Sequence, residues 1–446
     1  MITYEEFCEF IEMPYIISFD NNVLMDLYRN PTQNAKDLLS LFEKIKSKTN
    51  ITYQVYKEYL NNYKKVRGEE KKKYDKVKNE LKSVIENTQR DIEKKIKGYK
   101  RYNYKDIGDL QEFLTQKIDE MKNKADSYLS ENANEIEENM KFLENDEVKS
   151  YIDSLNSIGN ILQEISFEKR IEILREGEIR YNNLLPPGYE DIDKEGMDKY
   201  GDLFVWKELM SIPEKKKVNI IFTTNDTKED WWIKDKRDNC VCIRPELEKE
   251  FLEKNPEYKI EMLTLDVFYC YMSKHLNIQS LHTTLNLGIH SFINSFMSKR
   301  LYYNKVEANL IETVNDIDLT EYALEEFNDS ELVWDEWSID NGSVEIRDEY
   351  AIYNFETNGH ADFKLYYEDN EGDNIDIGEI NIDLVGNVVV KCKINENYQC
   401  DDEPEIINID FHVDFGEFRS MEIIYMERES DAKAEMMDAL ENYYSH

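Results

Sequence analysis

Residues 14–24, PYIISFDNNVL, and residues 218–226, VNIIFTTND, share one pattern: a short apolar run that ends in polar residues and an aspartate. The pattern of a strand ending in an acid, then a helix, predicts an α/β core with a parallel sheet. The carboxyl ends of parallel strands meet at one edge of a sheet, and ligands bind there. Asp20 and Asp226 are therefore expected at the same edge.

The segments between these two runs are predominantly helical in pattern. Residues 34–47 place apolar side chains on one helical face, and ITYQVYKEYL at 51–60 closes the first block. Residues 63–180 are rich in Lys and Glu and almost free of Gly and Pro, which predicts two to four long helices in a coiled-coil-like excursion. A helix containing YGDLFVWKELM follows Pro186-Pro187-Gly188.

A different pattern begins near residue 311, after a stretch at 259–310 that is expected to be helical and to connect the domains. Apolar and acidic residues alternate in runs such as YAIYNFET and NVVVKCKI, which predicts a separate antiparallel β domain. Gly386-Asn387 predicts a tight hairpin between two of these runs, and SDAKAEMMDALENYY predicts a short acidic helical tail. The predicted organisation is an α/β core at 1–62 and 180–275, a helical insertion at 63–179, a connector at 276–310 and an acidic β-rich domain at 311–446.

Charge is segregated along the chain. The net charge of the whole chain is −38, but residues 311–446 carry 38 acidic and 7 basic residues, a net of −31. Residues 64–105 carry 16 basic and 7 acidic residues and interleave them with tyrosines. This basic stretch is either an arm that follows a nucleic-acid backbone or a solvated helix face, and the sequence favours neither.

Several classes of protein are disfavoured. The six cysteines are scattered without a CxxC pair, and the six histidines have no HExxH spacing, so a zinc enzyme or a cysteine protease is not expected. No apolar run approaches the ~20 residues that span a bilayer. The first residues, MITYEEFCEF, are acidic where a signal peptide would be basic, so a cytoplasmic protein is expected.

Four carboxylates are candidates for chemistry, although each has an ordinary explanation. Asp20 and Asp226 could be turn formers or helix N-caps at strand ends. Glu58 alone is typical of a solvated helix, and Asp202 of a first helical turn, where the dipole favours acids.

The surrounding motifs make the combination specific. ISFDNNVLMDLYR, the Glu of VYKEYL, LPPGYEDIDK, KYGDLFVWKEL, IIFTTNDTKEDWW and RPELEKEF occur in this order. In order and context they resemble the PIN-like domain family, in a subtype with a long helical insertion and an Asp-Trp-Trp ending. The resemblance covers about 14–62 and 180–275. Where the family usually has Asp-Thr-Asn or Asp-Ser-Asn, this chain has Asp20-Asn21-Asn22, so a hydroxyl is lost.

The resemblance implies a catalytic, metal-binding cluster of Asp20, Glu58, Asp202 and Asp226. Carboxylates brought close together repel one another, and a hard divalent cation such as Mg²⁺ or Mn²⁺ relieves the repulsion. Such ions can activate water and stabilise the leaving oxygen of a phosphodiester.

Further residues are expected near the cluster. Asn22 and Thr224 would orient ligands or substrate, and Lys228 and Arg244 are candidates for phosphate contacts, with a solvated helix residue and a structural salt bridge as the respective alternatives. Asp230 could be a fifth acid or half of a structural Asp–Arg pair. Trp231 and Trp232 are expected to pack in the core rather than stack on bases.

The implied function is a metal-dependent endonuclease that cuts RNA, or single-stranded DNA, as a regulated toxin or phage-defence effector. The alternatives are a catalytically silent PIN-like scaffold that binds a protein partner, or a structure-specific DNA nuclease. Three interpretations of the acidic domain stay open: it docks a partner, it folds over the basic arm in place of nucleic acid, or it provides solubility. PIN-like domains commonly dimerise, so a homodimer or higher oligomer is expected.

Overall fold

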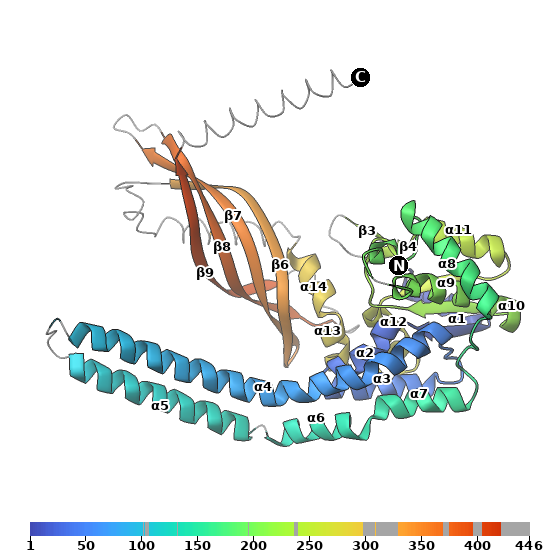
Figure 1. Cartoon of the computed structure of the whole chain (residues 1–446), viewed down its shortest axis with the longest axis horizontal. Helices are drawn as coiled ribbons and strands as arrows, with labels where there is room; N and C mark the ends of the chain where they lie inside the picture. The colour runs from blue at the N-terminus through green and yellow to red at the C-terminus, as the bar shows by residue number, and fades with distance from the viewer. Residues whose placement is uncertain are drawn as a thin grey trace. The chain divides into compact units, whose positions relative to one another are not determined.

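The computed structural model describes residues 1–100, 102, 107–131, 133–194, 196–235, 240–297, 308, 329–368, 374–395 and 404–420. The chain divides into two units (Figure 1). The first comprises Met1–Asp235 and Cys240–Thr283, and the second comprises Lys236–Asn239 and Thr284–His446.

A parallel sheet forms the centre of the first unit. Its strands are β1 (Tyr15–Phe19), β2 (Asn219–Thr223) and β5 (Ile260–Leu263), in the order β1-β2-β5. Phe19 pairs with Thr223, so the residues that follow these two strands leave the sheet side by side. The predicted parallel α/β core is confirmed.

Strand β5 corrects one prediction. Residues 259–310 were expected to be helical, but Ile260–Leu263 pairs with β2 before helix α12 begins at Leu265. The strand has only four residues and joins the helix directly, so it is too short to show an alternating pattern of its own.

Helices and a small ribbon surround the sheet. The helices are α1 (Tyr4–Glu12), α2 (Asn21–Arg29), α3 (Thr32–Lys44), α9 (Gly201–Met210), α10 (Ile212–Lys216), α11 (Pro245–Lys254), α12 (Leu265–His275) and α13 (Leu281–Leu287). The 3₁₀ turns η1 (Tyr189–Asp191) and η2 (Asp198–Tyr200) precede α9, and β3 (Trp232–Lys234) pairs antiparallel with β4 (Cys240–Ile243). The ring of Phe19 stacks on Phe42 with centroids 4.3 Å apart and meets Phe268 edge-on, so apolar contacts hold α3 and α12 to β1.

The Lys/Glu-rich segment is a helical excursion. Helix α4 (Tyr53–Lys100) runs for 48 residues, α5 (Ile107–Glu131) returns alongside it, and α6 (Ala133–Asn145), α7 (Glu147–Ser157) and α8 (Phe167–Asn182) lead back to the sheet (Figure 1). Helix α4 begins ten residues before the predicted insertion, so Glu58 lies on the same continuous helix as the basic stretch.

Asp146 anchors the base of this excursion. Its carboxylate accepts hydrogen bonds from the Tyr28 hydroxyl of α2, at 2.6 Å, and from the Arg67 guanidinium of α4. Tyr28 is also within 2.9 Å of the Tyr59 hydroxyl. The helix that carries Glu58 is therefore fixed to the helix that starts beside Asp20.

The second unit contains a four-stranded antiparallel sheet, which confirms the predicted antiparallel β domain. Its strands are β6 (Asp329–Arg347), β7 (Tyr350–Glu368), β8 (Asn374–Lys393) and β9 (Glu405–Ser420), in sequence order. Helix α14 (Ile289–Met297) packs on this sheet, with the ring centroids of Phe292 and Tyr353 3.9 Å apart.

The predicted hairpin at Gly386-Asn387 is wrong. Gly386 pairs with Thr357 on β7 and with Phe411 on β9, so the two runs around it form one strand. A Gly-Asn pair forms a turn only where the chain can leave the sheet, and here both neighbouring strands hold the backbone extended. The predicted acidic helical tail lies outside the described residues.

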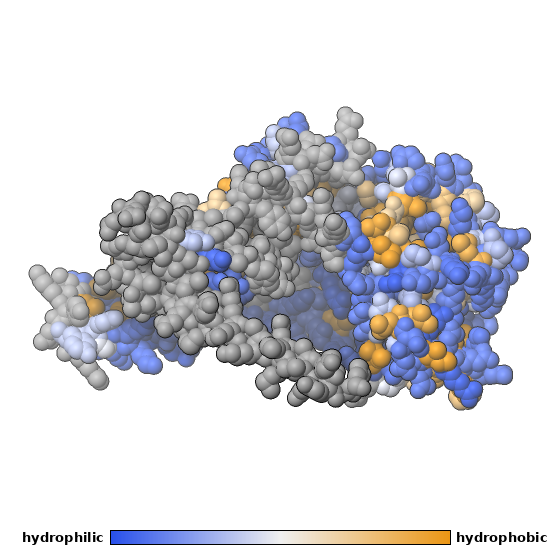
Figure 2. Space-filling model, turned by 90° about the horizontal axis from the view of Figure 1, so that it is seen from above, coloured by the Kyte–Doolittle hydropathy of each residue, from blue (hydrophilic) through white to orange (hydrophobic). Residues whose placement is uncertain are grey.

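The visible surface of the first unit is mainly hydrophilic, with apolar side chains exposed in several separate places (Figure 2). Within the described part of the chain, none of the helices has both the length and the apolar character needed to cross a membrane.

Candidate active site

Four separate elements bring the four predicted carboxylates to one region of the first unit. Asp20 follows β1 and caps α2, and Asp226 lies in the loop after β2. Asp202 is in the first turn of α9 and Glu58 is in the second turn of α4. Each of the four side chains keeps part of its surface open to solvent.

Asp20 is held by three donors. Its Oδ1 accepts a hydrogen bond from the Asn21 backbone N–H at 2.6 Å. Its Oδ2 accepts from the Asn22 amide and from the Thr224 hydroxyl, both at 2.8 Å. The Thr224 hydroxyl also accepts a hydrogen bond from the Asp226 backbone N–H at 3.0 Å, so one side chain ties the two strand ends together.

Lys228 lies between two acids. Its ammonium group is 2.7 Å from Asp191 Oδ1 and 3.4 Å from Asp226 Oδ2. Residues 224–230 form a loop, so Lys228 is not the solvated helix residue considered as its alternative. The Lys228 ammonium is already neutralised by carboxylates and can reach a phosphate only by leaving at least one of them.

Asp202 and Glu58 are positioned by buried neighbours. Asp202 Oδ2 accepts a hydrogen bond from the indole N–H of Trp231 at 3.2 Å. Glu58 Oε1 accepts one from the Gln54 amide at 2.6 Å, within helix α4. A Cβ added at Gly201 would lie 2.9 Å from Glu58 Oε1, so the glycine lets α9 approach the Glu58 carboxylate closely.

Burial and mutual repulsion raise the pKa values of three of these acids. Burial, opposed by three hydrogen bonds and assisted by Asp226, raises the pKa of Asp20 to about 6. Burial, together with the charge of Asp20, raises the pKa of Glu58 to about 7. The pKa of Asp202 is raised well above its ordinary value, first by burial and then by Asp20 and Asp226. The acids therefore feel one another's charge.

The donor set suits a hard divalent cation, but the carboxylates do not yet converge on one. Among the described residues, no three Asp, Glu, His or Cys side chains are close enough together to hold a metal ion. The carboxylate of Asp20 is held by Thr224 and Asn22, whereas the carboxylate of Asp226 is held by Lys228. Carboxylate oxygens are nevertheless the ligands that Mg²⁺ and Mn²⁺ prefer, and a cation would relieve the repulsion that raises these pKa values.

Asp230 adds a buried acid to the same region. Its side chain is fully buried, and its Oδ2 accepts a hydrogen bond from the Gly188 backbone N–H at 2.7 Å. Its Oδ1 has no hydrogen-bond partner within the described residues. Burial, followed by the charge of Asp226, raises its pKa. Among the described contacts, Asp230 has no ion pair with an arginine. A buried carboxylate oxygen without a hydrogen-bond donor is rare, because it destabilises the folded state.

The other predicted residues lie at the margin of the cluster. Arg244 pairs with Glu246 at 2.8 Å and donates to the Glu229 carbonyl at 3.0 Å, which is a structural role. Trp231 and Trp232 are buried, as predicted. Both also donate hydrogen bonds into the site, Trp231 to Asp202 and Trp232 to the Asp226 carbonyl at 2.7 Å.

The structure adds three residues to the site. Gln54 donates to Glu58, and its backbone N–H donates to Glu208 at 3.1 Å. Burial raises the pKa of Glu208 to about 7. Asp191 is buried between Lys194 and Lys228, and although burial opposes this, the two lysines hold its pKa below the ordinary value. A spacing of four residues to Glu58 on a helix could have indicated Gln54, but only the fold places Glu208 and Asp191 here.

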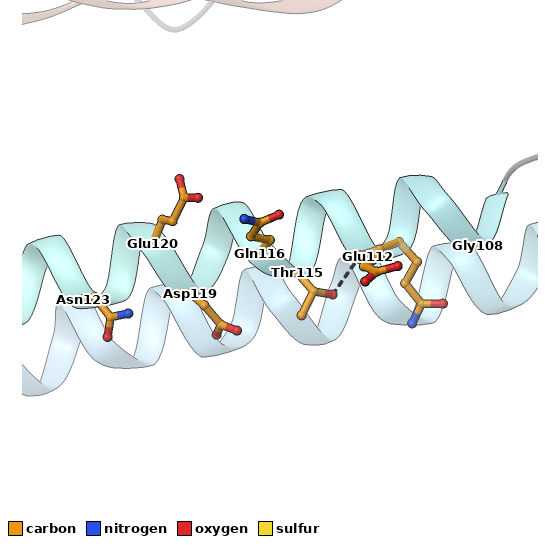
Figure 3. A pocket seen from close by; sticks show the side chains of 8 residues that line it. Gly108, Glu112, Thr115, Gln116, Asp119, Glu120 and Asn123 are labelled. Atoms are coloured by element: carbon orange, nitrogen blue, oxygen red, sulfur yellow. Dashed lines mark hydrogen bonds between the residues drawn. The ribbon is translucent and has the colours of Figure 1, made fainter.

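An open cavity of about 600 Å³ lies elsewhere, along α5 (Figure 3). Polar and acidic side chains such as Gln111, Glu112 and Asp119 line it, and Lys and Arg are absent from its lining. The charged residues of this lining are all acidic and would repel a polyanion, so this cavity is not a candidate for binding nucleic acid.

Comparison with known proteins gives one match. A family model described as a PIN like domain matches residues 16–247, which is more than half of the 446 residues. The matched span includes all four carboxylates and also runs through the helical excursion, whereas β5 lies beyond its end. No curated protein and no solved structure matches the chain significantly.

Proposed function

The chain belongs to the PIN-like domain family, and from this premise we propose that it is a divalent-cation-dependent endonuclease acting at Asp20, Glu58, Asp202 and Asp226. Domains of this family have a nuclease-type fold and act on nucleic acid. The observation that carries the proposal is geometric: the Thr224 hydroxyl joins the Asp20 carboxylate to the Asp226 backbone, and both acids lie close enough to Asp202, on a third element, to raise its pKa. A protein without use for these charges has no physical reason to bury them together.

Each acid has a defined role in this proposal. Asp20, Glu58, Asp202 and Asp226 would hold Mg²⁺ or Mn²⁺, and Asp230 could supply a fifth oxygen. When bound, such a cation polarises the scissile phosphate and lowers the pKa of a water molecule. Thr224 and Asn22 orient Asp20, Trp231 orients Asp202, and Gln54 orients Glu58.

Lys228 has a more specific role. The Lys228 ammonium, 2.7 Å from Asp191 Oδ1 and 3.4 Å from Asp226 Oδ2, would give up the longer contact to Asp226 to bind a phosphate oxygen of the substrate. A Lys228→Met variant is expected to raise KM more than it lowers kcat. A fall in kcat as large as the rise in KM would instead indicate that Lys228 holds Asp226 and Asp191 in place.

RNA is the favoured substrate, with single-stranded DNA as the alternative. A role as a regulated toxin or phage-defence effector follows from the resemblance to the family. The second candidate function is a silent scaffold that binds a protein partner through the acidic sheet of the second unit. The predicted domain boundaries at 62/63, 179/180, 275/276 and 310/311, and the homodimer, stay proposals of the same kind.

One experiment separates the nuclease from the scaffold. Labelled tRNA, total RNA and single-stranded DNA are incubated with the protein in Mn²⁺ or EDTA. The wild type is expected to cleave in Mn²⁺ only, and Asp20→Asn and Asp226→Asn to lose this cleavage. Absence of metal-dependent cleavage of every substrate, with the variants indistinguishable from wild type, would reject the nuclease and favour the scaffold.

A further inference from the structure

Helix α4 carries a row of basic side chains on the same face as Glu58. At ~100° per residue, five basic residues fall within about 40° of the Glu58 direction. They are Lys65, Lys72, Lys76, Arg90 and Lys94, and all five are exposed. We call them the α4 stripe. The acids between them are Glu69 and Glu80, and Glu80 pairs with Lys76 at 3.2 Å, so the face keeps a net positive charge.

The opposite face of α4 is occupied by the returning helices. Ile85 and Ile96, about half a turn from the stripe, are buried. Salt bridges on the flank of that face join Lys71 to Glu144 of α6, at 4.0 Å, and Glu86 to Lys122 of α5, at 3.9 Å. Lys71 and Lys122 hold the helices of the excursion together through these salt bridges, whereas the stripe residues lie about 100–140° around α4 from Lys71. Figure 1 shows α5 and α6 running alongside α4.

The composition of the stripe indicates what it recognises. Ser83 and Asn87 lie between its basic residues, Asn62 lies between Glu58 and Lys65, and aromatic residues are absent from these positions. Tyr63, the aromatic residue nearest to its start, is buried and stacks on Tyr59 with centroids 5.2 Å apart. Binding of single strands commonly depends on bases stacking on aromatic side chains, whereas charge alone is sufficient to bind the phosphates of a duplex.

The dimensions also suit a duplex. Lys65 and Lys94 are separated by 29 residues of continuous helix, or about 44 Å. This length corresponds to about 13 base pairs at 3.4 Å each. We propose that the α4 stripe binds the phosphate backbone of a double-helical nucleic acid and leads it to the acidic cluster. The proposal rests on the proposed nuclease function for its destination, and it narrows the substrate to nucleic acids with a helical stem.

The helix supplies a matched control for the test. Lys65, Lys72 and Lys94 are changed together to Gln in the full chain. The control changes Lys64, Lys82 and Lys95 to Gln, which removes the same charge from exposed positions of the same helix, about 100–120° away from the stripe. Binding of a labelled 20-base-pair duplex of mixed sequence, made as RNA and as DNA, is measured by anisotropy in EDTA over a range of salt concentrations.

The expected result is asymmetric. The stripe variant should bind the duplex at least tenfold more weakly than wild type and lower the salt slope by about 2 to 3, while the control loses less than twofold. The matching single strand should bind more weakly than the duplex. Equal losses in the two variants, tighter binding of the single strand, or no duplex binding by wild type would each overturn the proposal.

Duplex length and cleavage give independent readouts. Wild-type affinity should rise with duplex length up to about 13 base pairs and then level off, and a plateau at 6 base pairs or fewer would contradict the stripe. Binding is measured without Mn²⁺, so the proposed nuclease function can fail separately. If the protein binds duplex through the stripe but never cleaves it in Mn²⁺, the proposal for the stripe is supported and the proposed nuclease function is rejected.

Discussion

The two units of this protein both contain many acidic residues, but the acids lie in different environments. In the first unit, Asp20, Glu58 and Asp202 are partly buried at the carboxyl edge of a parallel sheet, and their pKa values are raised. In the second unit, the described acids such as Glu345 and Asp383 stand on the wet face of an antiparallel sheet, with side chains 60% and 78% exposed. The number of acidic residues in a unit therefore says little about its chemistry. Burial is what lets neighbouring carboxylates raise one another's pKa strongly.

The largest expected effect comes from neutralising one buried acid. Asp202→Asn should lower nuclease activity by about 10²–10³-fold, since a cation loses a charged ligand. The same variant should unfold at a temperature about 2–4 °C higher in EDTA, because removing a repelled charge stabilises the first unit by about 1 kcal/mol. Asparagine can still accept the hydrogen bond from Trp231.

Thermal unfolding and cleavage assays check both effects together. Glu345→Gln, in the second unit, is the matched control because it neutralises an acid that is exposed. It should change neither the unfolding temperature nor the nuclease activity. The prediction would be wrong if Asp202→Asn kept its nuclease activity or were less stable than wild type in EDTA. Asp202 would then be neither needed for cleavage nor destabilised by the neighbouring acids.

The next effect is on pH dependence. The pKa values of about 6 for Asp20 and about 7 for Glu58 lie above their ordinary values of 3.8 and 4.5. In the absence of metal, their contribution to stability is complete below about pH 4 and is lost as the pH rises towards 7, because the unfolded chain ionises first. Mn²⁺ binding needs the ionised forms, so its affinity should rise between pH 5.5 and 7 by up to tenfold per pH unit for each acid that must lose a proton.

Calorimetry in buffers of different ionisation enthalpy tests this, since Mn²⁺ binding at pH 6 should release protons. The protons contributed by Asp20 and Glu58 should be almost absent at pH 8. A metal affinity that does not change with pH would mean that Asp20 and Glu58 are ionised throughout this pH range.

A smaller effect is expected from Gln54. Gln54→Leu removes the amide that donates to Glu58 and should lower kcat about tenfold, with little change in unfolding temperature. Gln89→Leu, on the same helix but far from the site, is the control and should leave kcat unchanged. Full activity of Gln54→Leu would remove Gln54 from the machinery that positions Glu58.

The smallest effect concerns the second unit itself. If its net negative charge screens the basic face of α4, truncation after Gly288 should raise activity a few-fold at low salt and less at 0.5 M salt. This endpoint keeps the Thr283 hydroxyl bonded to Asp37 at 2.6 Å and removes α14 together with the sheet on which it packs. Activity that is unchanged at every salt concentration would reject the masking role.

Parts of the fold could be predicted from short-range pattern. The runs PYIISF and VNIIF are apolar enough to be buried strands, and the alternation after residue 311 fixes one wet face for each later strand. The four-residue strand β5 and the continuity of β8 through Gly386 could not be predicted, because both depend on pairing with strands distant in sequence.

The sequence alone determined which acids to consider, through two strand ends and an ordered set of motifs. Only the tertiary structure decided how they interact: that Thr224 joins Asp20 to the Asp226 backbone, that Lys228 neutralises Asp226 and Asp191, and that Gln54 and Glu208 lie behind Glu58. The physical reason is the distance along the chain over which each kind of interaction is set. Strand and helix patterns arise from neighbours along the chain, whereas a raised pKa requires burial and charges that only folding brings within a few ångströms.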